Sequence, residues 1–125
     1  MFEKYLIVED SLRNVAGGFE FQARLGYYRG LGLSMVEDLA VAINGAAVPR
    51  EAIRFNEGKG PLRLAEMETA YDRRWGFGEP ATISVDWPEP LAAGAHRLAL
   101  TERLRVSYMP FPSIRQSETE VCIAG

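Results

Sequence analysis

The sequence has few of the residues that self-sufficient active sites use. Its 125 residues contain one cysteine, Cys122, and one histidine, His96. A single cysteine cannot form an internal disulfide, and this pair excludes a zinc site of the usual His-rich or Cys-rich kind. The serines form no nucleophile elbow, and the glycines form no phosphate-binding loop. We therefore expect no complete catalytic centre in this chain.

Long apolar runs and basic tracts are also missing. No apolar stretch approaches the roughly 20 residues that cross a bilayer, and residues 1–4 lack the pattern of a secretory signal. Together with the single cysteine, this predicts no membrane partner and a cytoplasmic location. The net charge is −3 without a basic cluster, so the sequence lacks the positive surface that binds nucleic acid.

Composition and length predict one ordinary folded domain. Hydrophobic residues make up 47% of the chain and charged residues 25%, which is typical of a soluble globular protein. A chain of this length can bury a core without disulfides or a metal. We therefore expect a single domain over residues 1–125.

Strand patterns dominate the chain. Asn44-Gly45 follows an alternating segment and is the strongest two-residue hairpin signal. The strands that we expect are Tyr5–Val8, Phe19–Leu25, Leu39–Ile43, Ile53–Phe55, Leu62–Leu64, Ala81–Trp87, Arg97–Tyr108 and Thr119–Ile123. One helix is predicted over Leu64–Arg74, where good helix formers precede Gly76. The expected fold is all-β: an antiparallel β-sandwich or jelly-roll-like domain with one short helix.

The segment Tyr108–Pro112 is an unusual end for a strand. From Leu98 onward apolar and polar residues mostly alternate, and Pro110 and Pro112 then stop the ladder because proline has no N–H to donate. Met109 and Phe111 are large and apolar where a solvated turn would carry Asn, Asp, Gly or Ser. The segment is either a cover over the domain's own core or a surface that another molecule covers.

Two further connections share this character. Residues 27–33 and 71–78 also concentrate aromatic and arginine side chains, and the three segments hold seven of the 13 aromatic residues. Leaving such side chains in water forgoes roughly 1.5–3 kcal/mol each, so the domain or a partner must cover them. They either plug the ends of the sandwich or form a surface for a partner or ligand. Stacking of aromatic rings on sugars keeps a carbohydrate-binding module open.

The remaining reactive residues have structural explanations. We expect His96 to bond nearby backbone and Cys122 to be a buried, inert thiol in a terminal strand. Glu66, Glu68 and Asp72 share one face of the predicted helix. This face is either solvated and paired with arginines or the acid–base centre of a small independent enzyme.

Several blocks of the sequence resemble the small (beta) subunit of bacterial C-glycoside deglycosidases, and the resemblance covers nearly the whole chain. The blocks are Met1–Tyr5, Gly18–Leu25, Tyr27–Leu31, Glu66–Asp72, Trp75–Pro80 and Tyr108–Pro112.

This resemblance implies a sandwich-like subunit that binds a catalytic, TIM-barrel-like alpha subunit. The alpha subunit would carry a divalent metal, expected to be manganese, and a histidine base, with no cofactor in this chain. The complex would perform a lyase-type cleavage of the C–C bond between a 3-oxo-sugar and an aromatic aglycone.

We expect the aromatic and arginine segments to form the interface with that subunit or part of the aglycone pocket. The candidate residues are Tyr27, Tyr28, Arg29, Glu68, Tyr71, Arg74, Trp75, Tyr108, Met109 and Phe111. No catalytic residue and no metal ligand is expected in this chain.

Overall fold

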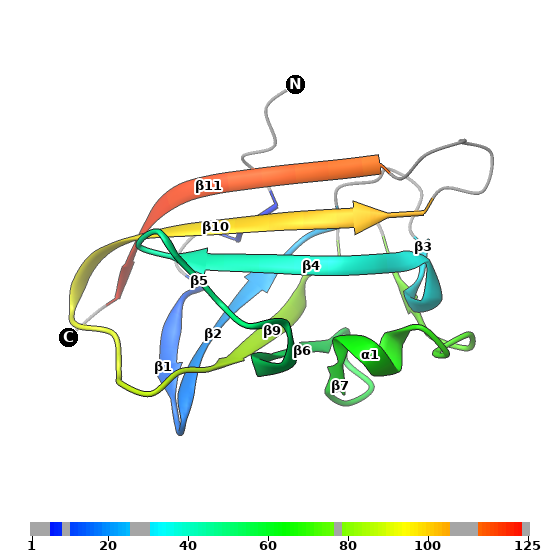
Figure 1. Ribbon diagram of the computed structural model, residues 1–125, viewed down its shortest axis with the longest axis horizontal. Helices are drawn as coiled ribbons and strands as arrows, with labels where there is room; N and C mark the ends of the chain where they lie inside the picture. The colour runs from blue at the N-terminus through cyan, green and yellow to red at the C-terminus, as the bar shows by residue number, and fades with distance from the viewer. Residues whose placement is uncertain (1–5, 9–10, 26–30, 77–78, 106–112, 124–125) are drawn as a thin grey trace.

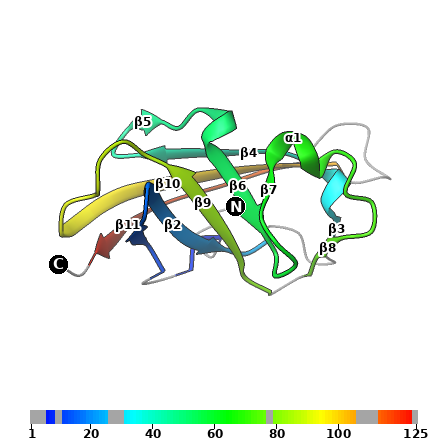
Figure 2. The same ribbon diagram turned by 90° about the horizontal axis from the view of Figure 1, so that it is seen from below.

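The fold is a sandwich of two antiparallel sheets. The structure, a computed structural model, describes residues 6–8, 11–25, 31–76, 79–105 and 113–123, and of Ser113 and Arg115 the backbone alone. The two sheets form separate layers in Figure 1, and their strands cross at an angle when seen from below in Figure 2. The all-β prediction is confirmed for the described residues.

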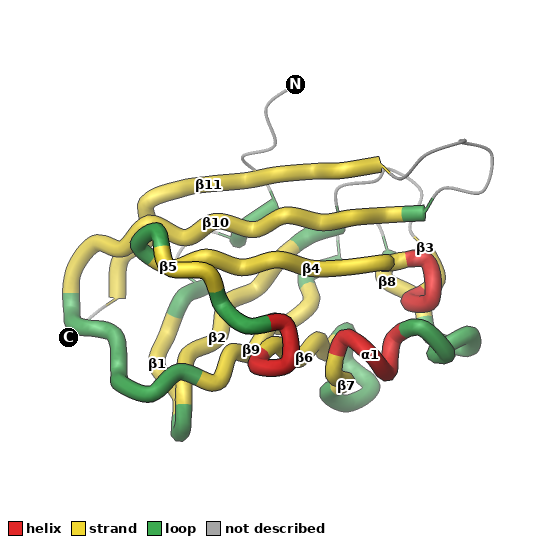
Figure 3. Tube along the Cα trace, in the orientation of Figure 1, coloured by secondary structure: helices red, strands yellow, loops and turns green. Residues whose placement is uncertain are grey.

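The strands fall into three sheets. The five-stranded sheet has the order β1 (Arg13–Val15), β2 (Gly18–Ala23), β9 (Ala81–Asp86), β6 (Ile53–Asn56) and β7 (Leu62–Arg63). The four-stranded sheet has the order β11 (Ser113–Ile123), β10 (Gly94–Leu104), β4 (Val36–Ile43) and β5 (Ala46–Ala47). A small third sheet pairs β3 (Leu31–Gly32) with β8 (Arg74–Trp75). Figure 3 shows the short helical segments, which are η1 (Leu33–Met35), η2 (Arg50–Ala52) and α1 (Leu64–Met67).

Alternation along the strands builds one core between the two main sheets. Phe19 and Phe21 of β2 pair in register with Val85 and Ile83 of β9, and all of these side chains are buried. The opposite layer contributes inward side chains of β4 and β10, such as Leu39, Val41, Ile43, Leu98, Leu100 and Leu104. Because successive side chains of a strand point to opposite faces, this pattern leaves most polar residues outside, while His96, Glu102 and Ser117 are buried. The apolar positions of the predicted strands thus placed the core correctly.

The predicted hairpin turn joins β4 to β5. Asn44 has φ 51° and Gly45 has φ 84°, the two left-handed positions that a type I′ turn requires. A second hairpin joins β6 to β7, where the Asn56 side-chain oxygen accepts the N–H groups of Gly58 and Gly60 at 2.7 and 3.1 Å. The hairpin predicted at Asn44-Gly45 is confirmed.

The predicted helix is much shorter than expected. It ends at Met67 instead of Arg74. The chain continues through two four-residue turns, in which Ala70 N–H donates to Met67 C=O and Arg73 N–H donates to Ala70 C=O. Leu64 and Met67 are buried, and the Glu66 carboxylate accepts the Arg63 N–H at 2.8 Å at the helix start. The side chain of Arg73 bonds the β6–β7 connection, so tertiary contacts override the helix propensity of this segment.

The last two strands differ from their predicted bounds. β10 begins at Gly94, and β11 covers Ser113–Ile123 where only its last five residues were expected. Polar residues such as Ser117 occupy inward positions of β11. The alternation of apolar and polar residues that indicates a strand is therefore missing from the first part of β11. Tyr5–Val8 contributes, within its described residues, a single bridge between Ile7 and Ala23.

Candidate partner-binding surface

The described flanks of the three aromatic segments meet at one end of the sandwich, which we call the loop end. β2 ends at Ala23, which pairs with Ala81 at the start of β9. β3 pairs Leu31 with Trp75 of β8. The end of β10 and the start of β11 lie at the same side of the molecule as β3 in Figure 1. Segments far apart in the sequence therefore share one end of the fold.

Backbone bonds hold these flanks together. Leu33 N–H donates to Arg73 C=O at 2.9 Å, and Arg105 N–H donates to Met35 C=O at 2.7 Å. η1 thus connects the β8 strand on one side with the end of β10 on the other. Because both contacts are made by the main chain, side-chain changes at the surface of this end leave them in place.

A partly buried ion pair anchors the turn that precedes β8. The Arg73 Nε donates to Glu57 Oε2 at 2.7 Å, and its Nη2 donates to Glu57 Oε1 and to Gly60 C=O, the latter at 2.6 Å. The side chains of Arg73 and Glu57 are 14% and 7% exposed. The hydrogen bonds from Arg73 lower the pKa of Glu57, against the opposing effect of burial. This bidentate pair joins the residue 70–75 segment to the β6–β7 hairpin.

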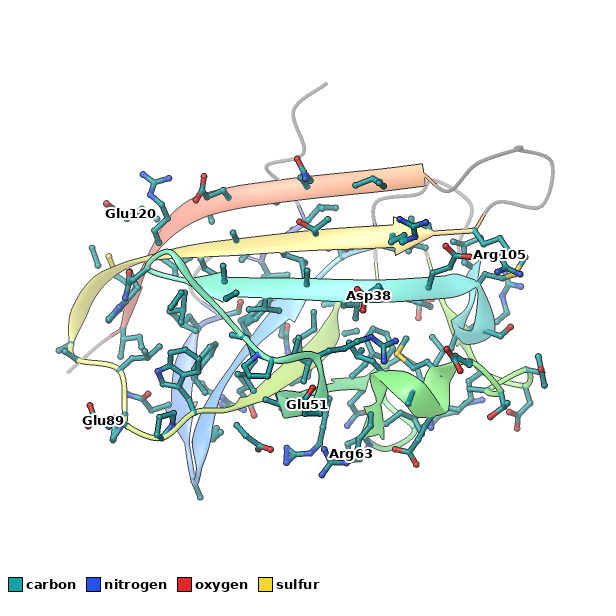
Figure 4. All side chains as sticks on the ribbon, viewed as in Figure 1. Asp38, Glu51, Arg63, Glu89, Arg105 and Glu120 are labelled. Atoms are coloured by element: carbon teal, nitrogen blue, oxygen red, sulfur yellow. The ribbon has the colours of Figure 1, made fainter. Side chains whose placement is uncertain are left out.

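Two arginines and a glutamate form a second ionic group at the end of β10. Arg103 Nε and Arg105 Nε donate to the two carboxylate oxygens of Glu37 at 3.0 and 2.9 Å. Hydrogen bonds from Arg105 and then Arg103 lower the pKa of Glu37. Figure 4 labels Arg105 at the edge of the loop end. The group presents positive charge beside the point where the described part of β10 ends.

Four of the predicted interface residues lie within the described structure. Glu68 and Arg74 are exposed, and Tyr71 is 76% exposed. Tyr71 lies two residues before the anchored Arg73, so a large ring stands in water on a turn that tertiary contacts hold. Six predicted residues lie outside the described structure: Tyr27, Tyr28, Arg29, Tyr108, Met109 and Phe111.

Trp75 requires a correction, because its side chain belongs to the core. It is 1% exposed, its ring meets Phe55 edge-on at 4.8 Å, and its indole N–H donates to Glu79 C=O at 2.9 Å. A tryptophan that buries its ring and satisfies its N–H is structural. We therefore leave Trp75 out of the surface offered to a partner.

The sequence patterns did not single out Ile114, which is 54% exposed. Ile114 pairs in register with Arg103 and shares the outer face of β11 with Gln116 and Glu118, which are also exposed. If the strand had been predicted at its full length, Ile114 would have stood out as an apolar residue on the polar face of the strand. Ile114 adds an apolar side chain close to the loop end.

The candidate reactive residues are arranged for structural roles. His96 Nδ1 lies 2.9 Å from Asn44 Nδ2, and its Nε2 lies 2.6 Å from Ala92 C=O, which confirms the prediction that it bonds nearby backbone. Cys122 is an exposed free thiol, so the prediction that it is buried is wrong. The inward positions at this end of β11 belong to its neighbours Val121 and Ile123, and alternation turns Cys122 to the other face. In the described part of the chain, no three His, Cys, Asp or Glu side chains lie together as a metal site would require. None of the described helices is long and apolar enough to cross a membrane.

Comparison with known proteins shows the family to which this chain is similar. The sequence model of the C-glycoside deglycosidase beta subunit family matches residues 2–108. The 3'-dehydrocarminate deglycosidase beta subunit of a Microbacterium species is 36% identical over 110 residues, which cover 88% of this chain and 83% of the relative.

Two further relatives carry the name C-glycoside deglycosidase beta subunit. The protein from Eubacterium cellulosolvens is 29% identical over 86% of this chain and 78% of its own length. The protein from Arthrobacter globiformis is 26% identical over 94% of this chain and 90% of its own length. These matches confirm the family that the sequence blocks indicated. The chain belongs to the C-glycoside deglycosidase beta subunit family, whose members are small subunits of a deglycosidase complex.

Proposed function

We propose that this chain is a non-catalytic subunit that binds a catalytic alpha subunit through the loop end, and thereby stabilises it and shapes its aglycone pocket. The observation that carries the proposal is the exposure of Tyr71 on a turn anchored by Arg73 and Glu57. A rigid aromatic side chain in water is the residue type that dominates protein interfaces when it becomes buried.

The proposed reaction cleaves the C–C bond between a 3-oxo-sugar and an aromatic aglycone. The name of the Microbacterium relative specifies a 3'-dehydro substrate for that protein, which supports a 3-oxo-sugar here. A carbonyl at C3 acidifies the proton on C2, and a base can remove it. The bond from C1 to the aglycone then breaks as a C1=C2 double bond forms, and the aromatic carbon of the aglycone takes up a proton. A divalent metal, which we propose to be manganese, would stabilise the negative charge that develops.

The described residues of this chain do not fit that chemistry. His96 is held by Asn44 and by the Ala92 carbonyl, and Glu66 accepts a backbone N–H at the start of α1. We therefore assign the base and the metal to an alpha subunit with a TIM-barrel-like fold, and no proton transfer to this chain. Its contribution is to pack against that subunit and exclude water at the mouth of the active site.

A free-standing carbohydrate-binding module is the alternative function. Such a module needs an exposed aromatic platform, and Trp75 does not supply one because it is buried. Among the described residues, Tyr71 is the most exposed aromatic side chain, at 76% exposure. One ring on a turn supports a point of contact with a protein better than a sugar platform.

The test is co-expression of this chain with the alpha subunit of the same organism. We expect the wild-type chain to co-purify with it, and Tyr71→Ala to raise the dissociation constant about tenfold, because an interface aromatic typically contributes more than 1 kcal/mol. Val15→Ala is the matched control, since Val15 is also exposed but pairs with Gly18 at the opposite end of β2.

Two outcomes would contradict the proposal. The first is separate elution of the two wild-type chains at micromolar concentration. The second is a purified chain that binds sugars and loses this binding in Tyr71→Ala, which would favour the carbohydrate-binding module.

A further inference from the structure

Among the described residues, β11 is the longest strand at the edge of a sheet. The five-stranded sheet ends in β1 and β7, of three and two residues, and the four-stranded sheet ends on one side in β5, of two residues. The opposite edge is β11, with 11 residues that pair with β10 without a register shift. Proteins usually shorten, bulge or cover such edges because their free N–H and C=O groups bind other strands.

The backbone bonds show which groups of β11 point away from the sheet. Asn44 N–H donates to Arg97 C=O at 2.8 Å, and Arg97 N–H donates to the Asn44 side chain, so the backbone of Arg97 faces β4. In an antiparallel ladder the backbone groups of successive residues alternate in direction. Leu98 and Leu100 of β10 therefore face β11, where their register partners are Thr119 and Ser117.

The intervening residues of β11 consequently point their N–H and C=O groups away from β10, to the side on which the described part of the chain places no strand. These residues are Ile114, Gln116, Glu118, Glu120 and Cys122, and their side chains are also exposed. In Figure 1, β11 is the outermost strand of its layer. The edge thus combines outward-facing main-chain groups with one apolar and two acidic side chains.

The charges on this edge select the kind of strand that it accepts. Glu118 pairs with Arg97 at 3.8 Å, and both side chains are 58% exposed, so this ion pair is weak and leaves the carboxylate open to a second cation. Glu120 is exposed on the same face and is labelled in Figure 4. A second copy of this chain fits poorly, because the fully overlapping antiparallel register places Glu118 opposite its own copy. Like charges directly opposite each other destabilise a strand pair.

We propose that β11 binds an extended strand of the alpha subunit by strand addition, and that this strand carries Lys or Arg opposite Glu118 and Glu120. The proposal rests on the proposed function, since it requires an alpha subunit. Main-chain bonds along the edge provide affinity, and the alternating side chains provide specificity. Ile114 lies at the end of β11 nearest the loop end, so the added strand would continue the surface that includes Tyr71.

Proline substitution tests the main-chain bonds. Glu118→Pro removes an outward N–H and leaves the pairing with β10 intact, which edge strands tolerate. We expect the dissociation constant of the complex to rise at least tenfold while the thermal midpoint of the isolated chain changes little. Thr119→Pro is the matched substitution on the other side of the strand. It removes a bond to β10, so it should lower the thermal midpoint of the isolated chain.

Charge reversal tests the chemistry of the partner strand. The double variant Glu118→Lys, Glu120→Lys should raise the dissociation constant at least tenfold, because it places cations opposite cations. The double variant Glu51→Lys, Glu89→Lys changes two exposed residues outside the strands. It matches the change in net charge and should leave the complex intact. This measurement remains decisive even where Glu118→Pro impairs folding.

The outcomes separate this proposal from the proposed function. Wild-type affinity in the charge-reversal variant, with Tyr71→Ala still weakening the complex, overturns strand addition and leaves the loop-end interface standing. A homodimer of the isolated chain that the edge variants dissociate also overturns it, because the occupant of the edge would then be a second copy.

Discussion

At the residue scale, Asn44 performs two tasks with one side chain. It occupies a left-handed position, with φ 51°, and its amide connects His96 Nδ1 at 2.9 Å with the Arg97 N–H, also at 2.9 Å. The Nε2 of His96 in turn reaches Ala92 C=O. The turn, the histidine and the start of β10 are therefore one hydrogen-bonded unit.

Substitution of Asn44 should separate these two tasks. Asn44→Gly keeps the turn conformation but loses both side-chain bonds, at about 1–3 kcal/mol of unfolding free energy. Asn44→Ala loses the same bonds and adds about 1 kcal/mol for the left-handed backbone. Urea unfolding of both variants measures the difference.

Asn14 provides the control for Asn44. Its side chain also makes two hydrogen bonds, both with the backbone of Leu91, and its φ is not positive. Alanine should therefore be the better tolerated substitution at position 14 and glycine at position 44. The same ranking at both positions would show that the backbone conformation of the turn is not decisive.

At the scale of elements, the Arg73–Glu57 pair explains why α1 is short. The guanidinium group of Arg73 joins the connection between β6 and β7 to the connection between α1 and β8. It thereby positions the turn that carries Tyr71. A helix through Arg74 would move the guanidinium group out of reach of Glu57. Helix propensity in this segment amounts to tenths of a kilocalorie per residue, whereas a charged hydrogen bond contributes about 1.5–3 kcal/mol.

This pair should make stability depend on pH in the acid range. Because the pKa of Glu57 is lowered from its ordinary value of 4.5, its contribution is complete above that pH and is lost as the pH falls through the lowered pKa. Glu57→Gln should therefore cost about 1–3 kcal/mol at pH 7 and progressively less at pH values below 4.5. Chemical unfolding at several pH values measures this difference.

Glu51→Gln is the control for this pH dependence. Glu51 is exposed on η2 and is labelled in Figure 4. Its substitution should change the unfolding free energy by less than about 0.5 kcal/mol at any pH. A Glu57→Gln effect of constant size down to pH 3 would show that the carboxylate charge does not stabilise the pair.

At the scale of the whole molecule, the described sandwich has a buried core and two surface regions with exposed groups that a partner could cover. The core buries Trp75 together with the aromatic residues of β2 and β6, so the domain has a core that does not depend on a partner. The loop end exposes Tyr71, and the β11 edge exposes Ile114 and outward backbone groups. This combination fits a subunit that folds before it assembles.

Assembly should therefore raise the thermal stability of the chain by mass action. An alpha subunit that binds only the folded chain adds about 2.7 kcal/mol at a concentration 100 times the dissociation constant. For a domain of this size, this corresponds to a rise of roughly 10 °C in the thermal midpoint. Calorimetry at increasing alpha-subunit concentration measures it, and Tyr71→Ala should need a higher concentration for the same rise. A midpoint independent of that concentration would contradict a subunit that folds first and then binds.

Much of the fold followed from local patterns in the sequence. Alternation predicted β2, β4, β6 and β9, and Asn44-Gly45 predicted the β4–β5 turn. These features depend on side-chain period and backbone conformation, which neighbouring residues determine. The sequence blocks identified the family. The expectation that this chain has no metal ligands, drawn from its single histidine and single cysteine, stays a prediction.

The tertiary structure decided the features that depend on residues far apart in the chain. Tryptophan is a residue type common at protein interfaces, yet contacts with Phe55 and with the Glu79 carbonyl place Trp75 in the core. α1 stops at Met67 because Arg73 reaches Glu57, and β11 is long because β10 pairs with it over its whole length. Sequence alone determined the central strands β2, β4, β6 and β9 and which residues are chemically able to react. Which aromatic side chain remains exposed, and which strand remains an open edge, depended on packing between layers, because burial is a property of the neighbours that the fold supplies.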